Sequence, residues 1–584
     1  MKITKNNPSR LGIYVIFDAQ GIVDRYITYF LEEFNKYVKD IVVVVNGALT
    51  SESRKKLEKI TPVVLQRDNS GYDISAYKYG LNHIGFDKLK KYDEVIICND
   101  TMFGPVYPFS ELFDKMNALD VDFWGITKHS KFDNNLYNNK LGYIPDHIQS
   151  YFITFRQSLL SSPEFSSYWD NLPVITNRDS AIGVFETLFT KHFEDLGFKW
   201  SVYVDSKEFD EEDAINHSFL NSDIVVINDR CPVFKKKLFA SDYELFCKSH
   251  VPSTVANLYD YLLNTGLYDV SMIWENVLRT CSQAHFQKAV QLDYSVSSKR
   301  RTAGNISSKK CAVWLKLIDV KKLKQSISCL LNFGNKFDIY VSCDCENDVT
   351  TISQQYGLNI KKIIPLDTSF ASVFNEYLHN YDIVCNIDTT NIFNKAFYVL
   401  DVVAENVVGN DIQIDNILNL FDTDKSLGLL CYSDMDDILK QLKYYKKNFV
   451  KIQQECERLK LNVPVKRELA HMVPEKNCFW YRPAVFKKLE VFDDSVSSYY
   501  YSLIAQDAGY FSAYVRKIAL NELQNIQQVH KLTKKVFKKS FFSKVFRLIN
   551  LFFTTWKTQG LKKSINKTKG YIKRRVDRIL KKGE

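Results

Sequence analysis

An apolar run that ends in polar side chains at residues 99–101 carries the first groups that could do chemistry. Val95 to Cys98 has the length and composition of a buried strand, and Asn99, Asp100 and Thr101 follow it directly. In an α/β sheet, polar groups at the carboxyl end of such a strand face the crevice in which ligands bind. A carboxylate there could hold Mg²⁺ or Mn²⁺ against a diphosphate. We therefore predict that Asp100 is a metal ligand.

A glycine-containing loop, Asn69-Ser-Gly-Tyr-Asp73, lies just upstream and leads into a predicted helix over residues 74–81. Gly71 would let the backbone approach a ligand closely, and the helix start offers free N–H groups to an anion. Loop and strand end together have the layout of a nucleotide-sugar site. The alternative interpretation is an Asx turn that only caps a strand and a helix. The predicted donor-binding residues in this stretch are Asn69, Gly71, Asp73, Asn99 and Asp100.

Alternating strands and helices must position these groups. Apolar runs predict strands over residues 12–17, 41–45, 62–65 and 122–127, and helical patterns occupy 23–38 and 51–60. Alternation at these lengths is typical of a parallel, doubly wound α/β sheet. The carboxyl ends of its strands would gather on one edge, where we expect further contacts to the donor from Asp18, Asn46 and Arg67.

Polar residues on the far side of this edge could face an acceptor. A predicted strand delivers His129 to a loop, and His147 and Gln149 lead into another strand over 152–155. Lys235 lies in a basic run, residues 231–237, that could neutralise the diphosphate of a donor or of a lipid. The alternatives are a histidine with no ligand, a polar sheet edge and a basic surface coat.

Longer stretches carry a resemblance to known families. Asn-x-Gly-x-Asp, a helix and a strand ending in an acidic turn resemble the centre of GT-A glycosyltransferases, although Asn99 stands where their Asp-x-Asp motif begins. The stretches GYDISAYKYGL, CNDTMFGPVYPF, DFWGITKH, HIQSYFITFR and GVFETLFTKHFEDLGFKW occur in order and resemble the rhamnan synthesis protein F family. Residues 13–34 and 268–280 resemble the same family, so the resemblance spans about residues 10 to 285.

The resemblance implies a rhamnosyltransferase that uses a dTDP-rhamnose type of donor. Its acceptor would be a polyprenyl-linked, rhamnose-containing cell-wall polysaccharide at the inner face of a bacterial membrane, and the reaction would invert the anomeric centre. Inverting transfer needs a carboxylate to deprotonate the acceptor hydroxyl. Glu186, in a predicted helix over 179–199 with Asp179 or Ser180 as its N-cap, matches the acid of the family's helix, and Asp205 is the second candidate. The alternative for Glu186 is an exposed side chain paired to Lys191 or Arg178.

Two other functions fit the same residues. The chain could be a non-enzymatic glycan-binding or assembly factor built from decayed transferase domains, or it could perform the same chemistry with another nucleotide sugar. The intact Gly71, Asp73 and Asp100 argue against decay, and Asn99 argues for it.

A second, weaker copy of the first pattern follows a polar linker. Residues 381–388 echo residues 92–100, and residues 477–483 parallel residues 149–156. The loop at 366–371 has no glycine, so we predict that the second copy is non-catalytic. The predicted division is a catalytic domain (1–240), a helical extension (241–296), a linker (297–310), a second GT-A-like domain (311–528) and a basic amphipathic tail (529–584).

Composition and charge limit the setting. The 584 residues carry a net charge of +10, but residues 531–584 hold 18 Lys and Arg against two acids, so the preceding chain sums to −6. Phenylalanines at helical spacing in this tail predict an in-plane helix on an anionic membrane rather than nucleic-acid binding. Twelve cysteines without a CxxC pair indicate reduced thiols. With no signal sequence and no run long enough to span a bilayer, we predict a cytoplasmic, peripheral protein.

Overall fold

The computed structural model describes most of the chain. The described residues are 2–5, 7–205, 217–241, 246, 251–302, 309–317, 330–389, 406–432, 435–474, 477–489 and 496–517. The helices predicted in the basic tail at 531–584 therefore lie outside the described residues, as do residues 303–308 of the predicted linker. The boundaries of the five predicted segments, from the catalytic domain to the basic tail, remain predictions.

The first half of the chain forms an eight-stranded mixed sheet with the order β3-β2-β1-β4-β8-β6-β7, in which β9 also pairs with β6. Strands β1 to β4 are parallel, and β8 runs antiparallel between β4 and β6. Every strand predicted here is present. The bounds are β1 Arg10–Phe17, β2 Asp40–Asn46, β3 Val63–Arg67, β4 Glu94–Asn99, β6 Phe123–His129, β7 His147–Ile148, β8 Phe152–Arg156 and β9 Trp200–Val204.

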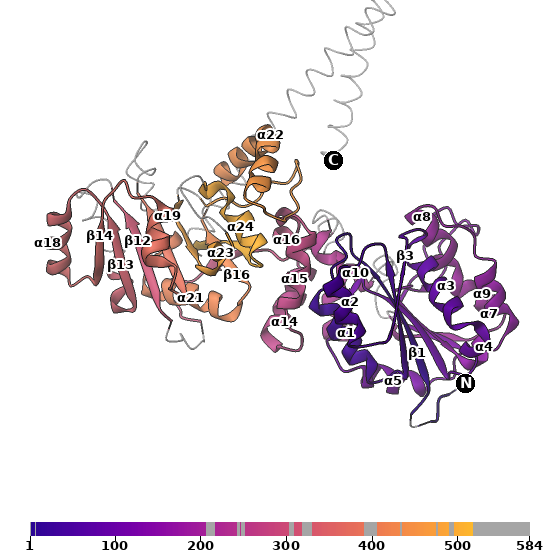
Figure 1. The fold of residues 1–584 in the computed structure, drawn as a ribbon. Coiled ribbons are helices and arrows are strands. Elements are labelled where there is room, and N and C mark those ends of the chain that lie inside the picture. The colour runs from indigo at the N-terminus through magenta and orange to yellow at the C-terminus, as the bar shows by residue number, and fades with distance from the viewer. Residues whose placement is uncertain are drawn as a thin grey trace, which may run out of the picture. The chain divides into compact units, whose positions relative to one another are not determined.

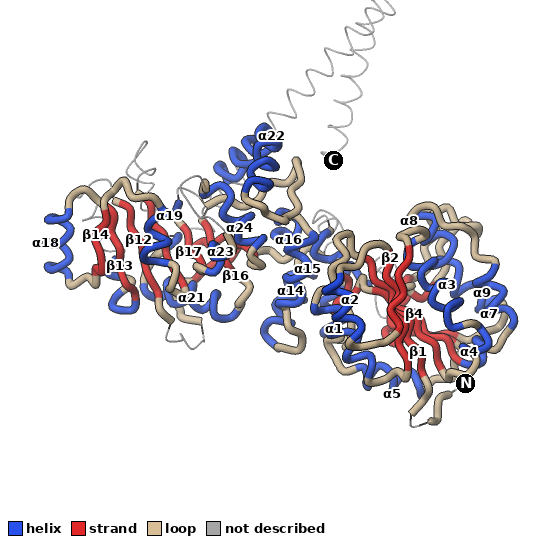
Figure 2. The backbone as a smooth tube through the Cα atoms, viewed as in Figure 1, coloured by secondary structure: helices blue, strands red, loops and turns tan. Residues whose placement is uncertain are grey.

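Helices cover both faces of this sheet (Figures 1 and 2). Tyr14 of β1 packs against Phe30 of α1 (Arg25–Asn35), which in turn meets Phe109 of α5 (Phe109–Asn117). The next residue back, Ile13, faces α3 (Tyr72–Ile84) on the other side, where a side chain on Gly80 would come within 2.6 Å of it. Because successive strand residues point to opposite faces, buried side chains on both confirm the doubly wound fold.

The second half repeats the plan. Its sheet has the order β11-β18-β16-β17-β15-β12-β13-β14, so β14-β13-β12-β15-β17-β16-β18 matches β3-β2-β1-β4-β8-β6-β9 strand for strand. The antiparallel strand again lies between two parallel ones. The predicted second α/β sheet is confirmed. The bounds are β11 Asp293–Val296, β12 Cys311–Lys316, β13 Phe337–Ser342, β14 Ile360–Ile364, β15 Ile383–Asp388, β16 Leu427–Cys431, β17 Phe479–Tyr481 and β18 Phe511–Lys517.

One buried arginine in each sheet shows how closely the two halves correspond. Arg156, at the end of β8, donates to the carbonyl oxygens of Met116 (2.6 Å) and Leu119 (2.7 Å), just where α5 ends. Arg482, after β17, donates to the carbonyl oxygens of Phe421 and Asp424, where α21 (Asp411–Thr423) ends. Helix ends leave carbonyl groups without partners, and both halves satisfy them in the same way.

The remaining elements are shorter or peripheral. In the first half they are α2 Ser51–Glu58, α4 Phe86–Leu89, β5 Met102–Phe103, α6 Gln157–Leu160, α7 Pro163–Asp170, α8 Arg178–Ala181, the π-helix η1 Ile182–Glu186, α9 Thr187–Asp195, α10 His217–Leu220, α11 Ser222–Ile227, β10 Phe234–Lys235, α12 Lys237–Ala240, α14 Thr254–Thr265, α15 Ser271–Thr280 and α16 Gln283–Ala289. In the second half they are η3 Gly334–Lys336, α18 Glu346–Tyr356, α19 Phe370–Val373, η4 Phe374–Leu378, α22 Met435–Arg458, α23 Ala484–Lys487, η6 Ser498–Tyr500 and α24 Tyr501–Asp507.

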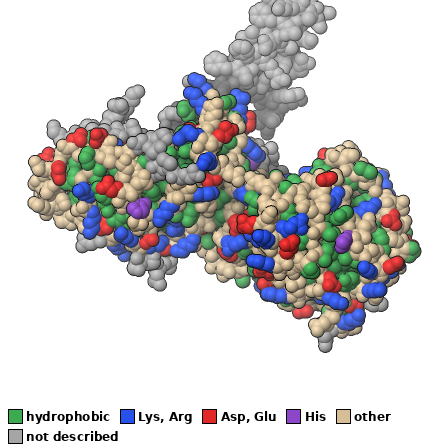
Figure 3. Space-filling view, viewed as in Figure 1, with side chains coloured by type: hydrophobic (Ala, Val, Ile, Leu, Met, Phe, Trp, Pro, Cys, Tyr) green, Lys and Arg blue, Asp and Glu red, His purple; other side chains and the backbone are tan. Residues whose placement is uncertain are grey.

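Three global features bear on the sequence predictions. Ten cysteines are free among the described residues. Within the same residues, no helix is long and apolar enough to cross a bilayer. On the face shown in Figure 3, Lys and Arg side chains are interspersed with Asp and Glu. That mixture agrees with a body of modest charge, as the division of the net charge predicted.

Candidate active site

A cavity of about 540 Å³, here the central cavity, opens beyond the carboxyl end of β4. Its walls come from the start of α3, the end of β6, β7, the α8–η1 helix and β10. Half of the residues predicted for the site, drawn from segments far apart in the sequence, line it together. They are Asp73, Asn99, His129, His147, Gln149, Glu186 and Lys235.

Glu186 reaches the cavity from the last position of the π-helix η1, between α8 and α9. The helix begins at Arg178 and its N-cap is Asn177, whose side chain accepts from the Ser180 N–H (2.9 Å) while Ser180 returns a bond to the Asn177 N–H. The prediction that Asp179 or Ser180 occupies the N-cap was wrong. A π-turn widens the helix by one residue and is frequent at functional sites.

The surroundings of Glu186 favour its ionised form. Burial alone would raise the pKa of its carboxyl, but the positive charge that His147 gains at acidic pH, a hydrogen bond from the Ser150 hydroxyl, and Lys235 outweigh it and lower the pKa. The alternative of an exposed Glu186 paired to Lys191 is wrong, because Lys191 pairs with Glu194 and Asp195. An ionised carboxylate beside a cavity is what a general base requires.

Two stacked histidines, His129 and His147, also line the central cavity. The rings of His129 and His147 lie 5.1 Å apart and nearly parallel. The Nδ1 atoms lie 2.7 Å from the carbonyl oxygens of Ser130 and Pro145, so each Nδ1 carries the hydrogen. Burial lowers the pKa of His129 to about 4 and also lowers the pKa of His147. Both rings are therefore neutral at pH 7, and each Nε2 is left as an acceptor.

Asp73 and Asn99 are hydrogen-bonded at the carboxyl end of β4. The Asn99 amide donates to a carboxylate oxygen of Asp73 (2.8 Å), while its own carbonyl accepts from Thr101. Burial, followed by the nearby charges of Asp100 and Glu186, raises the pKa of Asp73 to about 7. Three acidic side chains thus converge here, and Asp73 is the one that responds by holding a proton more tightly.

Asp100 faces the interior. Its carboxylate is 4% exposed and accepts from Lys236 Nζ (3.0 Å) and the Tyr26 hydroxyl (3.2 Å). The predicted metal ligand is therefore already neutralised by a lysine, and the residues present do not fit a metal held by Asp100. Among the described residues, no group of three or more His, Cys, Asp and Glu side chains could hold a metal ion.

Three cations border the central cavity instead. Lys235 and Lys237 flank Lys236 and line the cavity, and Arg178 faces it from the start of α8. Burial lowers the pKa of Lys235 to about 8 and also lowers that of Lys237. The sequence analysis named Lys235 as a site residue and included Lys237 only as part of the basic run at 231–237. The basic run was a usable signal for Lys237. Arg178 had no such signal, because the sequence analysis considered it only as a partner for Glu186.

The remaining donor candidates lie along the carboxyl ends of β1 to β3, outside the central cavity. Arg67 donates to the Asn46 side chain (2.6 Å) and to the Ser70 carbonyl (2.8 Å), and so braces the loop that holds Asn69. Gly71 has φ of 71°, in the left-handed region, and a side chain there would lie 2.0 Å from Ser75 Oγ. The glycine is thus required by the backbone turn itself.

Asp18 and Asp205 are both held by cations. Asp18 accepts from Arg279 of α15 (2.7 Å); burial would raise the pKa of its carboxyl, but Arg279 and two backbone N–H groups lower it. Asp205 pairs with Lys128 (2.7 Å) and lines a separate cavity of about 440 Å³. The structure therefore brings Glu186, and not Asp205, together with the other candidates.

Comparison with known proteins adds a family. A family model described as rhamnan synthesis protein F matches residues 41–556. An uncharacterized protein, y4gN, from Sinorhizobium fredii is 25% identical over 32% of this chain and 46% of its own length. Virulence protein VirA from Vibrio anguillarum is 24% identical over 30% of this chain and 52% of its own. The matches thus span about half the length of these relatives.

Several solved structures of transferases match parts of this chain. The glycosyltransferase GlyE from Streptococcus pneumoniae TIGR4 is 7% identical, with 65% of this chain and 85% of that chain covered and a TM-score of 0.22. A nucleotide-diphospho-sugar transferase from Desulfovibrio desulfuricans G20 is 15% identical, with 33% and 78% covered and a TM-score of 0.21. Mycobacterium tuberculosis glucosyl-3-phosphoglycerate synthase, solved with Mn²⁺ and UDP, is 11% identical, with 26% and 58% covered and a TM-score of 0.17. The doubly wound α/β class itself is established by the sheet order described above.

Proposed function

The chain belongs to the rhamnan synthesis protein F family, and on that premise we propose that it is an inverting rhamnosyltransferase of polysaccharide synthesis. Its donor is a dTDP-rhamnose type of nucleotide sugar, and its acceptor is a lipid-linked, rhamnose-containing glycan. Family membership and the GT-A-like fold support glycosyl transfer. The observation that carries the proposal is an ionised Glu186 in a cavity that also holds acceptor groups and cations.

Glu186 acts as the general base. The acceptor hydroxyl gives its proton to the Glu186 carboxylate as its oxygen bonds to the anomeric carbon of rhamnose. The bond from that carbon to the diphosphate breaks, and the nucleoside diphosphate leaves with the electron pair. The Ser150 hydroxyl fixes one carboxylate oxygen, and Gln149 and the neutral His147 offer acceptors and donors to the sugar hydroxyls.

The diphosphate is neutralised by the cations of the cavity. Lys235, Lys237 and Arg178 line its wall, and fixed positive groups at a developing charge stabilise a transition state. A divalent cation held by Asp100 was predicted from the sequence, but Asp100 pairs with Lys236 in the structure. No step is therefore assigned to a metal.

The nucleoside of the donor lies along the ends of β1 to β3. Asp18, Asn46, Arg67 and Asn69 supply polar groups there. Phe17, at the tip of β1, is 44% exposed and offers a flat apolar face on which a base can stack. This placement puts the base outside the central cavity and the sugar inside it.

Substitution of the base tests the proposal. In Glu186→Gln, transfer of rhamnose from dTDP-rhamnose to a rhamnan acceptor should fall by about 10²–10⁴-fold in kcat, while the donor Kd stays unchanged. Glu58→Gln, on exposed α2, is the matched control and should keep full activity. An inactive wild type that still binds glycan would favour the assembly-factor alternative. Activity only with another nucleotide sugar would favour different donor specificity.

The basic tail is proposed to hold the enzyme on the inner face of the cell membrane. Residues 531–584 carry a net charge of +16, and each basic side chain near an anionic leaflet contributes about 1 kcal/mol to binding. Removal of these residues should move the protein off vesicles that contain anionic lipid, as measured by cosedimentation. Equal binding by the full-length and shortened chains would exclude this role.

A further inference from the structure

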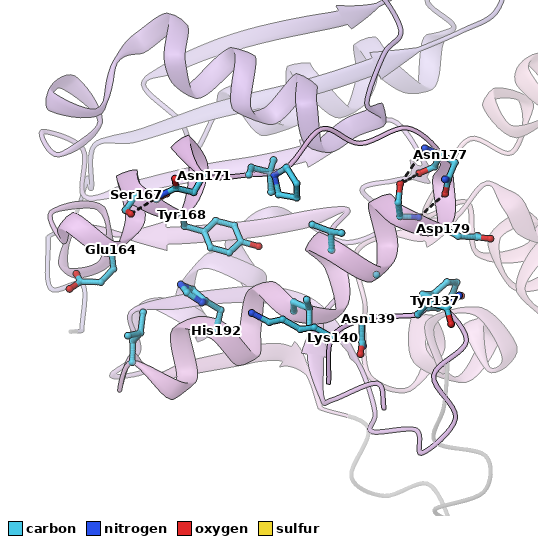
Figure 4. A pocket seen from close by; sticks show the side chains of 18 residues that line it. Tyr137, Asn139, Lys140, Glu164, Ser167, Tyr168, Asn171, Asn177, Asp179 and His192 are labelled. Atoms are coloured by element: carbon cyan, nitrogen blue, oxygen red, sulfur yellow. Dashed lines mark hydrogen bonds between the residues drawn. The ribbon is translucent and has the colours of Figure 1, made fainter. Parts of the chain in front are cut away.

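A second, larger cavity lies on the other side of the helix that carries Glu186. This lateral groove, about 920 Å³ in volume, is formed by α7, the loop at 137–140 and the outer face of α8, η1 and α9 (Figure 4). Its volume is at the upper end of the range of ligand sites. None of the catalytic, donor-binding or acceptor-side residues predicted from the sequence lines it.

The lateral groove and the central cavity are adjacent. Tyr137 lines both of them. Along the shared helix, Ala181 and Glu186 face the central cavity, whereas Gly183 and Leu188 face the groove. A ligand that ends at Glu186 can therefore continue past Tyr137 into the groove.

The groove combines apolar surface with hydrogen-bonding groups. Tyr168, Leu172 and Leu188 supply apolar area, and Asn171 and Glu164 lie beside them. The Tyr168 hydroxyl is buried and makes no hydrogen bond among the described residues. Figure 4 shows that hydroxyl pointing inward among the lining side chains. A buried hydroxyl without a partner is costly, so a ligand that supplies one gains affinity there.

The charges of the lining favour a neutral ligand. Lys140 and His192 contribute positive or neutral groups, and Glu164 and Asp179 contribute negative ones. The groove thus lacks the excess of cations that lines the central cavity. A sugar chain is uncharged, has apolar ring faces and carries many hydroxyls, and each of these properties has a counterpart in the groove.

We propose that the lateral groove binds the internal sugars of the glycan acceptor, whose terminal hydroxyl lies at Glu186. This inference rests on the proposed function and extends it, because it makes acceptor binding depend on the length of the glycan. A long acceptor occupies both the groove and the central cavity, whereas a short one reaches only the latter.

Two substitutions test the proposal. Tyr168→Phe removes only the unpartnered hydroxyl, and Leu188→Trp fills the groove. The probes are a fluorescently labelled rhamnan oligosaccharide and a rhamnose disaccharide, with binding measured on the full chain. Tyr168→Phe should weaken binding of the oligosaccharide roughly two- to tenfold, and Leu188→Trp should weaken it more. Tyr356→Phe, at an exposed position on α18, is the matched control and should bind as wild type does.

Kinetics separate this proposal from the proposed function. In both variants, KM for a long acceptor should rise while kcat and the donor Kd stay constant, and kcat/KM for the disaccharide should not change. Unaltered oligosaccharide binding in Tyr168→Phe, with a wild-type thermal midpoint, would overturn the groove assignment and leave the proposed function in place. Groove-dependent glycan binding without any transfer would overturn the proposed function and support the groove.

Discussion

Asp73 is the residue whose protonation couples the site to the stability of the fold. Its pKa is about 7 in the folded protein against 3.8 for an ordinary Asp, so the folded state binds the proton more tightly than the unfolded state. The free energy of unfolding must therefore fall as pH rises from about 4 to about 7, and level off above that.

Asp73→Asn should remove this loss. At pH 7 the variant should be more stable than wild type by roughly 1–3 kcal/mol, and the difference should shrink toward pH 4. Urea unfolding at several pH values measures this. Asp68→Asn, on the same loop but exposed, should show no such dependence. A variant whose stability tracks wild type across the range would mean that Asp73 is not the group that titrates.

The ion pair between Asp100 and Lys236 also contributes to the stability of the fold. Because both are largely buried, Asp100→Asn leaves Lys236 without its partner and should cost about 3 kcal/mol of unfolding free energy. If the pair replaces a metal, EDTA should not change donor binding, and Mn²⁺ should not raise the thermal midpoint. A rise with Mn²⁺ that Asp100→Asn abolishes would instead restore the predicted metal site.

For single residues, the sequence predicted which side chains lie near one another better than it predicted the role of each. The predicted strands and helices placed Asp73, Asn99 and Glu186 near one another, because the position of a side chain follows from strand and helix periodicity. Which carboxylate meets which cation depends on packing between distant segments. Lys236 reaches Asp100 across 136 residues, and Arg279 reaches Asp18 across 261, and no local pattern encodes either contact.

At the scale of the element, the helix from Arg178 to Asp195 determines the site. Its π-turn, η1, moves Glu186 toward the central cavity, and its outer face forms the groove. Apolar periodicity predicted a helix here, but it could not predict the π-turn, since that geometry is set by what the helix packs against. The N-cap was misassigned by two or three residues, because Asn177, Asp179 and Ser180 are all good capping residues.

Gly183 tests the importance of this packing. A side chain there would come within 2.4 Å of the Tyr137 carbonyl oxygen, which belongs to the backbone and cannot rotate away. Gly183→Ala should cost about 1–3 kcal/mol of unfolding free energy and displace the loop that borders both cavities. We expect transfer activity to fall together with stability, as measured by urea unfolding and a donor-turnover assay. Full activity at wild-type stability would show that the loop yields at no cost.

At the scale of the whole molecule, the chain carries the same sheet twice. A second α/β domain was predicted from a faint collinear similarity, and the structure adds that seven strands repeat in the same order. The similarity could be detected because strand periodicity survives substitutions that erase sequence identity. The register makes Asp388 the counterpart of Asn99, since Asp388 pairs with Lys316 as Asn99 pairs with Val15. The counterpart of Asp100 is Thr389, because their N–H groups donate to the carbonyl oxygens of Val15 and Lys316 respectively. A repeated fold does not imply repeated chemistry, because the chemistry of a site depends on single residues.

The second sheet has replaced polar groups at the corresponding edge. Helix α19 starts at Phe370, which packs against Trp314, Phe479 and Tyr501, whereas α3 presents Asp73 to a cavity. Asp388 accepts a hydrogen bond from the Asn477 side chain (3.2 Å). Aromatic side chains at this edge stabilise the fold by burying apolar area. This packing is the physical reason for our prediction that the second copy is non-catalytic.

Asp388→Ala should therefore leave transferase activity within about twofold of wild type, whereas Glu186→Gln should remove it. The variant should lose about 1 kcal/mol of stability, the usual contribution of one hydrogen bond. Activity per folded molecule is the quantity to measure, with circular dichroism as the check on folding. Loss of transfer in a folded Asp388→Ala chain would mean that the second sheet also carries out catalysis, and the two copies would then have to be treated as two active sites.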